Sequence, residues 1–334
     1  MTRRHPPLLL LAAVLACADP SQDSPLPTEP FTVPRGATLH AVAESLHTGG
    51  FVESPGLFRF YATISGKGRA VQAGTYDLPR GASPRRLLSI LVSGRPALRR
   101  LAIPEGLTLA EIARAVEIQL ALPAESVLAA ARDDSLREAL GVPASTLEGY
   151  LYPSTYYVRA DATARDVVRQ MAAEFEQRWQ RRWDRDAAQR GMTRHAIVTL
   201  ASIIEGEVRH DVDRRYVASV YANRLQRGMR LQADPTVIYA LGERRRLYER
   251  DYRTPSDYNT YLIDGLPPGP IGSPTAASIA AALHPAKTSF LYFVARQDGL
   301  HVFSRTYAEH LRTIARIRGG ERPQTEATRN GARR

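Results

Sequence analysis

A nine-residue pattern of apolar and turn-forming positions occurs three times in the first third of the chain. Phe31-Thr-Val-Pro-Arg-Gly-Ala-Thr-Leu recurs as Leu101-Ala-Ile-Pro-Glu-Gly-Leu-Thr-Leu, and Tyr76-Asp-Leu-Pro-Arg-Gly-Ala-Ser-Pro is a weaker copy. In each copy an apolar pair suited to a strand precedes a Pro-x-Gly turn. A hydroxyl residue that can cap a helix follows the turn: Thr38, Ser83 or Thr108. Apolar residues then recur at helical spacing, which predicts strand–turn–helix units over residues 31 to about 140.

The C-terminal part carries longer periodic segments. A stripe of large apolar residues at successive i+4 steps predicts one helix over residues 165–190, with the stripe packed in the core: Val167, Met171, Phe175, Trp179 and Trp183. Residues 290–295 and 300–304 flank the turn residues Asp298-Gly299, which predicts a hairpin, and a last helix begins at Tyr307. Helices mixed with a few hairpins indicate an α+β fold.

The segment after Thr193, a good N-cap, is apolar around its whole circumference as far as Ile204, which predicts a buried helix. Glu205 follows directly. A partly desolvated carboxyl has a raised pKa and keeps its proton near neutral pH, as a general acid needs. The simpler alternative is that Glu205 pairs with an arginine such as Arg209. Glu207 lies roughly 200° further round the helix, so the two carboxyls cannot both point into one cleft.

Further along, amphipathic and turn patterns alternate. Residues 216–227 are predicted to form a helix, and Asp234-Pro235 is typical of an N-cap followed by the first helical residue. Ser273-Pro274 is interpreted in the same way, as the start of a helix that reaches His284. Between them, residues 257–261 (Asp-Tyr-Asn-Thr-Tyr) and 265–271 (Gly-Leu-Pro-Pro-Gly-Pro-Ile) combine amides, hydroxyls and flat rings. Such a loop suits a sugar better than an apolar ligand.

The N-terminus indicates export. Arg3 and Arg4 precede an apolar run from Leu8 to Ala16, which spans roughly half of a ~30 Å hydrocarbon core at ~1.5 Å per residue. Residues 1–17 are therefore expected to be a signal peptide. Its end resembles a lipobox, so Cys17, the only cysteine, is the expected lipidation site. Residues 18–30 are expected to be a flexible tether, and residues 319–334 a disordered tail.

Composition narrows the function classes. The 334 residues suit two domains. Lysine and arginine outnumber the acids by 45 to 34, and only Lys67 and Lys287 are lysines. The charge therefore reflects either a genome-wide arginine bias or a surface for polyanions such as the cell wall. There is no Walker loop, no dinucleotide-binding glycine turn, no Gly-x-Ser-x-Gly elbow and no His/Cys cluster with metal spacing, so neither a cofactor nor a metal is expected.

Several motifs in this order resemble the endolytic murein transglycosylase family, also called YceG-like. They are residues 147–156 (LEGYLYPSTY), 201–207 (ASIIEGE), 217–225 (VASVYANRL), 229–239 (MRLQADPTVIY), 258–261 (YNTY), 265–271 (GLPPGPI) and 284–288 (HPAKT). The resemblance covers about residues 31 to 318. It implies a LysM-like module over residues 31–142, able to bind carbohydrate, and a mixed α+β catalytic domain over residues 143–318.

The resemblance also assigns residue roles. The catalytic glutamate of the family falls on Glu205. The residues expected to line or shape the cleft are Glu148, Gln232, Asp234, Asn259, Thr260 and Tyr261. Three positions depart from the family pattern: Gly206 replaces a usual lysine, Ser154 a usual acid, and residues 273–275 (Ser-Pro-Thr) a usual Asn-Pro-Gly. The short apolar N-terminus also differs from the membrane-spanning helix typical of the family.

The implied reaction is non-hydrolytic cleavage of the β-1,4 bond between N-acetylmuramic acid and N-acetylglucosamine, leaving a 1,6-anhydro end. One carboxyl suffices because the nucleophile is already held in the substrate. Two alternatives stay open: a glycoside hydrolase in which Glu148 or Asp234 is the second carboxylate, and a non-catalytic glycan-binding lipoprotein. The expected partners are peptidoglycan strands, peptidoglycan synthases and a membrane that holds the N-terminal anchor, but no nucleic acid. The expected location is the cell envelope, facing the periplasm or cell wall, with the inner membrane as the anchor.

Overall fold

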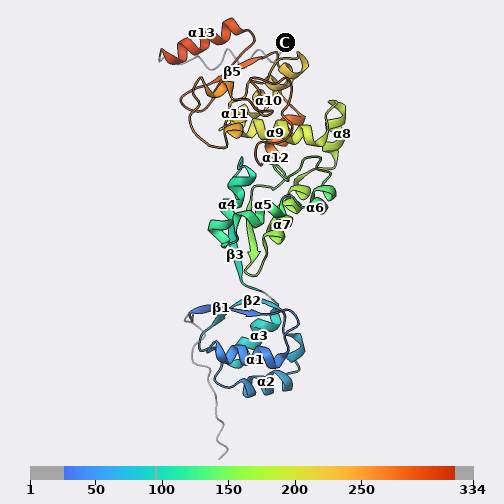
Figure 1. The fold of residues 1–334 in the computed structure, drawn as a ribbon, viewed down its shortest axis with the longest axis vertical. Coiled ribbons are helices and arrows are strands. Elements are labelled where there is room, and N and C mark those ends of the chain that lie inside the picture. The colour runs from blue at the N-terminus through green and yellow to red at the C-terminus, as the bar shows by residue number, and fades with distance from the viewer. Residues whose placement is uncertain (1–25, 95, 320–334) are drawn as a thin grey trace, which may run out of the picture. The chain divides into compact units, whose positions relative to one another are not determined.

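The computed structural model describes residues 26–94 and 96–319. The expected signal peptide, Cys17, most of the tether and nearly all of the C-terminal tail lie outside these residues. Within the described ranges, no helix has the length and apolar character needed to cross a membrane. The described residues form two compact units, which are divided between Ala97 and Leu98. Their elements are drawn in Figure 1.

The first unit joins two antiparallel strands to three helices. The strands are β1 (Thr28–Val33) and β2 (Gly74–Pro79), with Phe31 opposite Tyr76. The other elements are α1 (Leu39–Thr48), α2 (Pro55–Ile64), the 3-10 helix η1 (Gly68–Ala70) and α3 (Pro84–Ser93). Because β1 begins at Thr28, the last three residues of the segment expected to be a tether belong to the sheet.

The hydroxyl residues of the three-fold sequence pattern all cap helices, as predicted. Thr38 accepts a hydrogen bond from the Ala41 N–H at the start of α1. Ser83 caps α3 in the same way, and Thr108 caps α4 (Leu109–Leu120) within a reciprocal capping box. The three strand–turn–helix units are therefore real local structures.

The copy that contains Leu101 belongs to the second unit, so the boundary between compact units lies after Ala97 rather than after residue 142. Its strand β3 (Leu98–Ala102) pairs antiparallel with β4 (Thr155–Arg159). The helix that follows, α4, places Ile112 and Val116 in the same hydrophobic core as the later helices. Strand pairing and core packing both tie this copy to the chain that follows it.

The helix predicted over residues 165–190 is two helices, α7 (Ala164–Arg178) and α8 (Arg182–Gln189). Trp179 ends α7 in an extended conformation, and its indole N–H donates to Asp184 of α8. Trp179 and Trp183 pack edge to face with ring centroids 5.4 Å apart. The predicted apolar stripe is buried throughout, so the burial pattern is confirmed although the single helix is wrong.

The remaining elements of the second unit surround α9 (Arg194–Glu207), which packs against α8, α10, α11 and α12 (Figure 1). They are α5 (Ala124–Ala130), α6 (Asp134–Ala139), α10 (Asp211–Gln226), α11 (Asp234–Leu241), η2 (Asp251–Arg253), α12 (Ala276–Leu283), β5 (Tyr292–Ala295), β6 (His301–Ser304) and α13 (Tyr307–Arg318). Strands β5 and β6 form the predicted hairpin. Helices with small antiparallel sheets confirm the α+β class.

Two predicted helix caps are wrong by one or two positions. The N-cap of α11 is Ala233, so Asp234 is already helical and its side chain makes no capping bond. The N-cap of α12 is Thr275, whose hydroxyl accepts from the Ser278 N–H, whereas the Ser273 side chain is buried. At α11, Pro235 therefore stands at the second helical position, and the Asp234 carboxylate accepts from the Tyr261 hydroxyl instead of capping the helix. At α12, Pro274 lies before the N-cap, and the buried Ser273 hydroxyl makes no hydrogen bond within the described residues.

Candidate active site

Glu205 lies in the last turn of α9, with 3% of its side chain exposed. The nine residues from Ile197 to Glu205 are all buried, which confirms the helix predicted to be apolar around its circumference. A carboxyl at the end of such a helix needs several hydrogen-bond partners, because an unpaired buried charge is costly.

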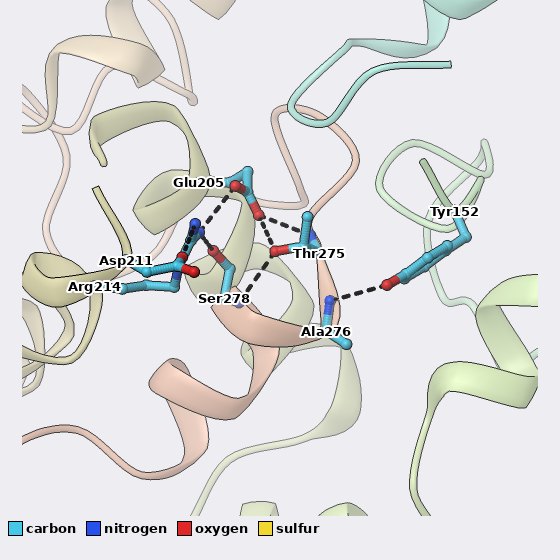
Figure 2. A network of polar contacts seen from close by, with 7 residues as sticks. All are labelled: Tyr152, Glu205, Asp211, Arg214, Thr275, Ala276 and Ser278. Atoms are coloured by element: carbon cyan, nitrogen blue, oxygen red, sulfur yellow. Dashed lines mark hydrogen bonds and ion pairs between the residues drawn. The ribbon is translucent and has the colours of Figure 1, made fainter. Parts of the chain in front are cut away.

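Three donors contact the Glu205 carboxylate (Figure 2). Its Oε2 accepts from the Thr275 backbone N–H at 2.7 Å and from the Thr275 hydroxyl at 2.6 Å. Its Oε1 accepts from Arg214 Nη1 at 2.9 Å. Because Thr275 is the N-cap of α12, the carboxylate also lies at the positive end of that helix. An arginine does pair with Glu205, but it is Arg214 of α10 rather than the neighbouring Arg209.

Arg214 is itself held in place by other contacts (Figure 2). Its Nε and Nη2 donate to Asp211 Oδ1 at 2.9 and 2.8 Å, and its Nη1 also donates to the Ser278 hydroxyl. Burial lowers the pKa of the Arg214 guanidinium, but the Glu205 and Asp211 carboxylates more than offset this and raise it. Arg214 is therefore a fixed cation beside Glu205.

A cavity of about 490 Å³ lies beside this end of α9. Its lining includes Ser202, one turn before Glu205, and Gly206, directly after it; Glu205 itself is not part of the lining. Gly106, from the turn before α4, also lines the cavity, and a Cβ added to it would lie 3.8 Å from Glu205 Cγ. Residues that flank Glu205 on two sides therefore form the cavity wall.

Glu148 is the buried carboxyl of this cavity. Both of its oxygens accept from the Leu109 N–H, at 2.9 and 3.1 Å, and Oε2 accepts from the Tyr239 hydroxyl at 3.3 Å. Burial raises the pKa of Glu148 to about 7, although these hydrogen bonds act in the opposite direction. Of the residues predicted to line the cleft, Glu148 is the one that lines this cavity.

Three other predicted residues form a polar cluster nearby, in exposed or half-buried positions. The Tyr261 hydroxyl donates to Asp234 Oδ1 at 2.7 Å. Gln232 accepts from Arg224 Nη1 at 3.3 Å and adopts a left-handed backbone with φ of 50°. Asp234 is followed by Pro235, which does line the cavity, so the cluster lies next to the cavity rather than inside it.

Asn259 and Thr260 are fully buried, so neither side chain is exposed to a ligand in this structure. The Asn259 side-chain amide donates to the carbonyls of Tyr252 and Thr254, at 3.1 and 2.9 Å. The Thr260 hydroxyl accepts from the Ala233 N–H at 2.9 Å, just before α11. These contacts fix the loop on which Tyr261 is carried.

The sequence did not reveal the partners of Glu205. Arg214 lies nine residues further on, in the next helix, and Thr275 lies seventy residues away; neither spacing carries a local signal. Within residues 26–94 and 96–319, no group of three or more His, Cys, Asp or Glu side chains is placed to hold a metal ion.

The comparison with known proteins now bears on this site. The model of the YceG-like family matches residues 31–316. The chain belongs to the YceG-like family. It is 32% identical to the endolytic murein transglycosylase of Bacillus subtilis (strain 168) over 309 residues, which cover 87% of this chain and 85% of that protein.

Two further proteins are similar to this chain over most of its length. The endolytic murein transglycosylase of Streptococcus pneumoniae R6 is 31% identical over 316 residues, and the match spans 85% of this chain but only 57% of that longer protein. The 2.6 Å crystal structure of a YceG-like protein from Listeria monocytogenes superimposes with a TM-score of 0.60. That protein is 32% identical, and the match covers 86% of this chain and 99% of the other. Sequence and fold therefore place the chain in one family.

Proposed function

We propose that this protein is a peptidoglycan lytic transglycosylase of the cell envelope, with Glu205 as its single catalytic acid and base. The observation that carries the proposal is the buried Glu205 carboxyl, which accepts hydrogen bonds from Thr275 and Arg214 and lies at the edge of a 490 Å³ cavity. The names of the Bacillus subtilis and Streptococcus pneumoniae relatives support the same activity.

The proposed reaction begins with the protonated Glu205 carboxyl donating its proton to the glycosidic oxygen. The bond from that oxygen to C1 of the muramyl sugar breaks, and N-acetylglucosamine leaves with a free hydroxyl. The muramyl 6-hydroxyl then attacks C1 and gives its proton to the Glu205 carboxylate, which restores the acid. No water is consumed, and the intramolecular nucleophile supplies the proximity advantage.

The contacts of Glu205 fit the ionised half of this role, in which the carboxylate acts as the base. Once the carboxyl has given up its proton, Arg214 and the two donors of Thr275 stabilise the charge that remains, because hydrogen bonds to an ionised acceptor are the strong ones. Because Glu205 does not line the cavity, its side chain is expected to release at least one of these donors when glycan binds.

The test is digestion of purified peptidoglycan by the chain without its first 20 residues, followed by mass spectrometry of the products. Ends lighter than a reducing sugar by one water are expected, and Glu205→Gln should abolish them while glycan still binds. Reducing ends would instead favour a hydrolase that uses Glu148, the buried carboxyl of the cavity with a pKa of about 7. Full activity in Glu205→Gln would overturn the assignment.

Three finer points belong to the same proposal. The first unit is proposed to act as a LysM-like module that binds glycan. Residues 1–17 are proposed to direct export, with Cys17 lipidated, so that the enzyme is anchored to a membrane in the envelope. Peptidoglycan synthases are proposed partners. A pull-down on insoluble peptidoglycan that compares residues 26–319 with residues 98–319 tests the first point, since binding should weaken without the first unit. Mass spectrometry of the membrane-extracted N-terminus tests the second.

A further inference from the structure

One sequence motif takes no part in the Glu205 site. The segment from His284 to Thr288, which follows α12, lines a second cavity of about 530 Å³. The facing wall comes from Arg190, at the end of α8, and from Arg215 and Asn223 of α10. The motif therefore builds a separate polar cavity at the C-terminal end of α12.

The charged residues of this cavity are cations. Arg190, Arg215 and Lys287 line it, and within the described part of the chain none of the three forms an ion pair with a carboxylate. The fourth titratable residue, His284, already contacts Asp186, with 3.1 Å between Nε2 and Oδ2. Positive charge in the cavity thus lacks a counter-charge from the protein.

The two arginines of the cavity, Arg190 and Arg215, differ in their hydrogen bonding. The Arg215 Nε donates to the His284 carbonyl at 2.9 Å, which fixes the guanidinium against the motif. The Arg190 Nε is buried and makes no hydrogen bond, and burial lowers the pKa of this guanidinium. A buried donor without a partner is costly, and a ligand that accepts from it removes the cost.

A smaller cavity of about 300 Å³ adjoins this cationic cavity. The two cavities share the lining residues Arg215, Ala286 and Lys287. The one carboxylate that lines the smaller cavity is Asp211. It accepts a hydrogen bond from Arg214, which also donates to Glu205. The two cavities together extend from the Glu205 network toward Arg190.

One helix connects the two sites. Thr275, at the N-cap of α12, holds the catalytic carboxyl, and His284, at its C-cap, lines the cationic cavity. The eight residues of α12 cover about 12 Å at 1.5 Å per residue. An extended peptide spans about 3.4 Å per residue, so about four residues cover this distance.

We propose that this cavity binds a carboxylate of the peptide carried by the muramyl sugar, so that the enzyme prefers peptide-bearing glycan to naked glycan. The inference rests on the proposed function, because it assumes that the glycan bond cleaved beside Glu205 belongs to peptidoglycan. Arginine suits the role, since its planar guanidinium grips a carboxylate with two parallel hydrogen bonds. N-acetylglucosamine carries no charge, and the lactyl carboxyl of the muramyl sugar is an uncharged amide where the peptide is attached, so on peptide-bearing glycan the anion comes from the peptide.

The binding test uses the chain from residue 26 with Glu205→Gln, which keeps glycan intact. Its probes are a synthetic stem tetrapeptide with free carboxylates and the same peptide with every carboxyl amidated. Calorimetric titration should give at least about tenfold tighter binding of the acidic peptide, weakening as salt rises. Lys287→Gln and Arg190→Gln should each remove most of that preference, whereas the exposed Arg312→Gln, on α13, should keep it. Equal binding of the two peptides would overturn the proposal.

The kinetic test uses the enzyme with Glu205 intact on peptide-bearing glycan and on glycan stripped by an amidase. Lys287→Gln should raise KM for the peptide-bearing substrate several-fold, leaving kcat and the stripped substrate unchanged. Lys287 is exposed, so this variant does not disturb the core. An unchanged KM would refute the carboxylate site while leaving the transglycosylase assignment intact. If the parent enzyme gives no cleavage products, the proposed function is refuted. The peptide titration would then still show whether the cavity binds a carboxylate.

Discussion

Thr275 donates both its backbone N–H and its hydroxyl to the same oxygen of Glu205, at 2.7 and 2.6 Å. Thr275 thus caps a helix with its side chain and at the same time fixes the proposed catalytic acid, so the start of α12 is coupled to the proposed chemistry. The Thr275 hydroxyl also accepts from the Ser278 N–H at 3.3 Å, so its proton is directed toward Glu205.

Thr275→Val tests this coupling, because valine keeps the shape and the backbone donor but removes the hydroxyl. We expect kcat to fall about tenfold, with a loss of about 1 kcal/mol in the free energy of unfolding from the missing cap. Thr306→Val, at the N-cap of α13, is the matched control. It should show a similar loss of stability and full activity. If both variants keep full activity, the Thr275 hydroxyl has no role in catalysis.

Arg214→Gln should cost more than Thr275→Val. The Arg214 and Glu205 side chains are only 13% and 3% exposed, and removing one partner of a buried pair costs about 3–5 kcal/mol. We expect a large fall in melting temperature and no measurable cleavage, whereas Asp211→Asn, whose side chain is 82% exposed, should reduce both only slightly. Thermal unfolding and product analysis of the two variants check this, and a stable, active Arg214→Gln enzyme would contradict it.

Glu148 should make stability depend on pH. Its folded pKa, about 7, lies above the ordinary value of 4.5, so the folded state holds a proton that the unfolded state releases. Stability from this group is complete below pH 4.5 and is lost as pH rises through 7, by about 3 kcal/mol in total. Glu148→Gln should remove that part of the decline in urea unfolding measured at pH 5 and pH 8.

Glu207 adds to the same trend. Burial raises its pKa to about 7 against the opposing hydrogen bond from the Tyr221 hydroxyl, at 2.8 Å. Part of the decline should therefore survive in Glu148→Gln and shrink further in the double variant with Glu207→Gln. A decline of the same size in the parent and Glu148→Gln proteins would show that Glu148 is not the titrating group.

Gly149→Ala should disturb the cavity through its neighbour Pro270. Gly149 has φ of 80°, and a Cβ there would lie 2.4 Å from Pro270 Cβ. Backbone strain and the clash together should cost about 2 kcal/mol or more and lower cleavage activity. Gly228→Ala, with φ of 64° and open space around it, is the control and should show the strain alone. Equal stability of the two variants would contradict the close approach.

Local features of the fold were predictable because they depend on neighbours in the chain. The caps at Thr38, Ser83 and Thr108, and the buried stripe through Phe175, follow from turn chemistry and periodicity. The break after Arg178 was not predictable, because the periodicity of the stripe continues through it.

The site shows the same limit. The burial of Glu205 follows from the apolar helix before it, and the family motifs pointed to Glu148, Asp234 and Tyr261. A periodic pattern indicates that a helix face is buried but not which residues bury it. The hydrogen bonds that Arg214 and Thr275 donate to Glu205 were therefore not predictable from the sequence. The α12 cap, predicted at Ser273 and found at Thr275, has the same explanation. The Thr275 hydroxyl donates to the Glu205 carboxylate, a contact that the local sequence does not indicate.

The Pro-x-Gly turn exists in near-identical form in both compact units, with different surroundings. At Gly36 the turn faces open space, whereas at Gly106 the backbone N–H donates to the Ser273 carbonyl and the glycine lines the cavity beside Glu205. The same turn is therefore a surface feature in the first unit and part of a cavity wall in the second. Excising residues 31–142 as an accessory module would remove Gly106 and with it part of the wall of the cavity beside Glu205, so a truncation that keeps this cavity must begin no later than residue 98.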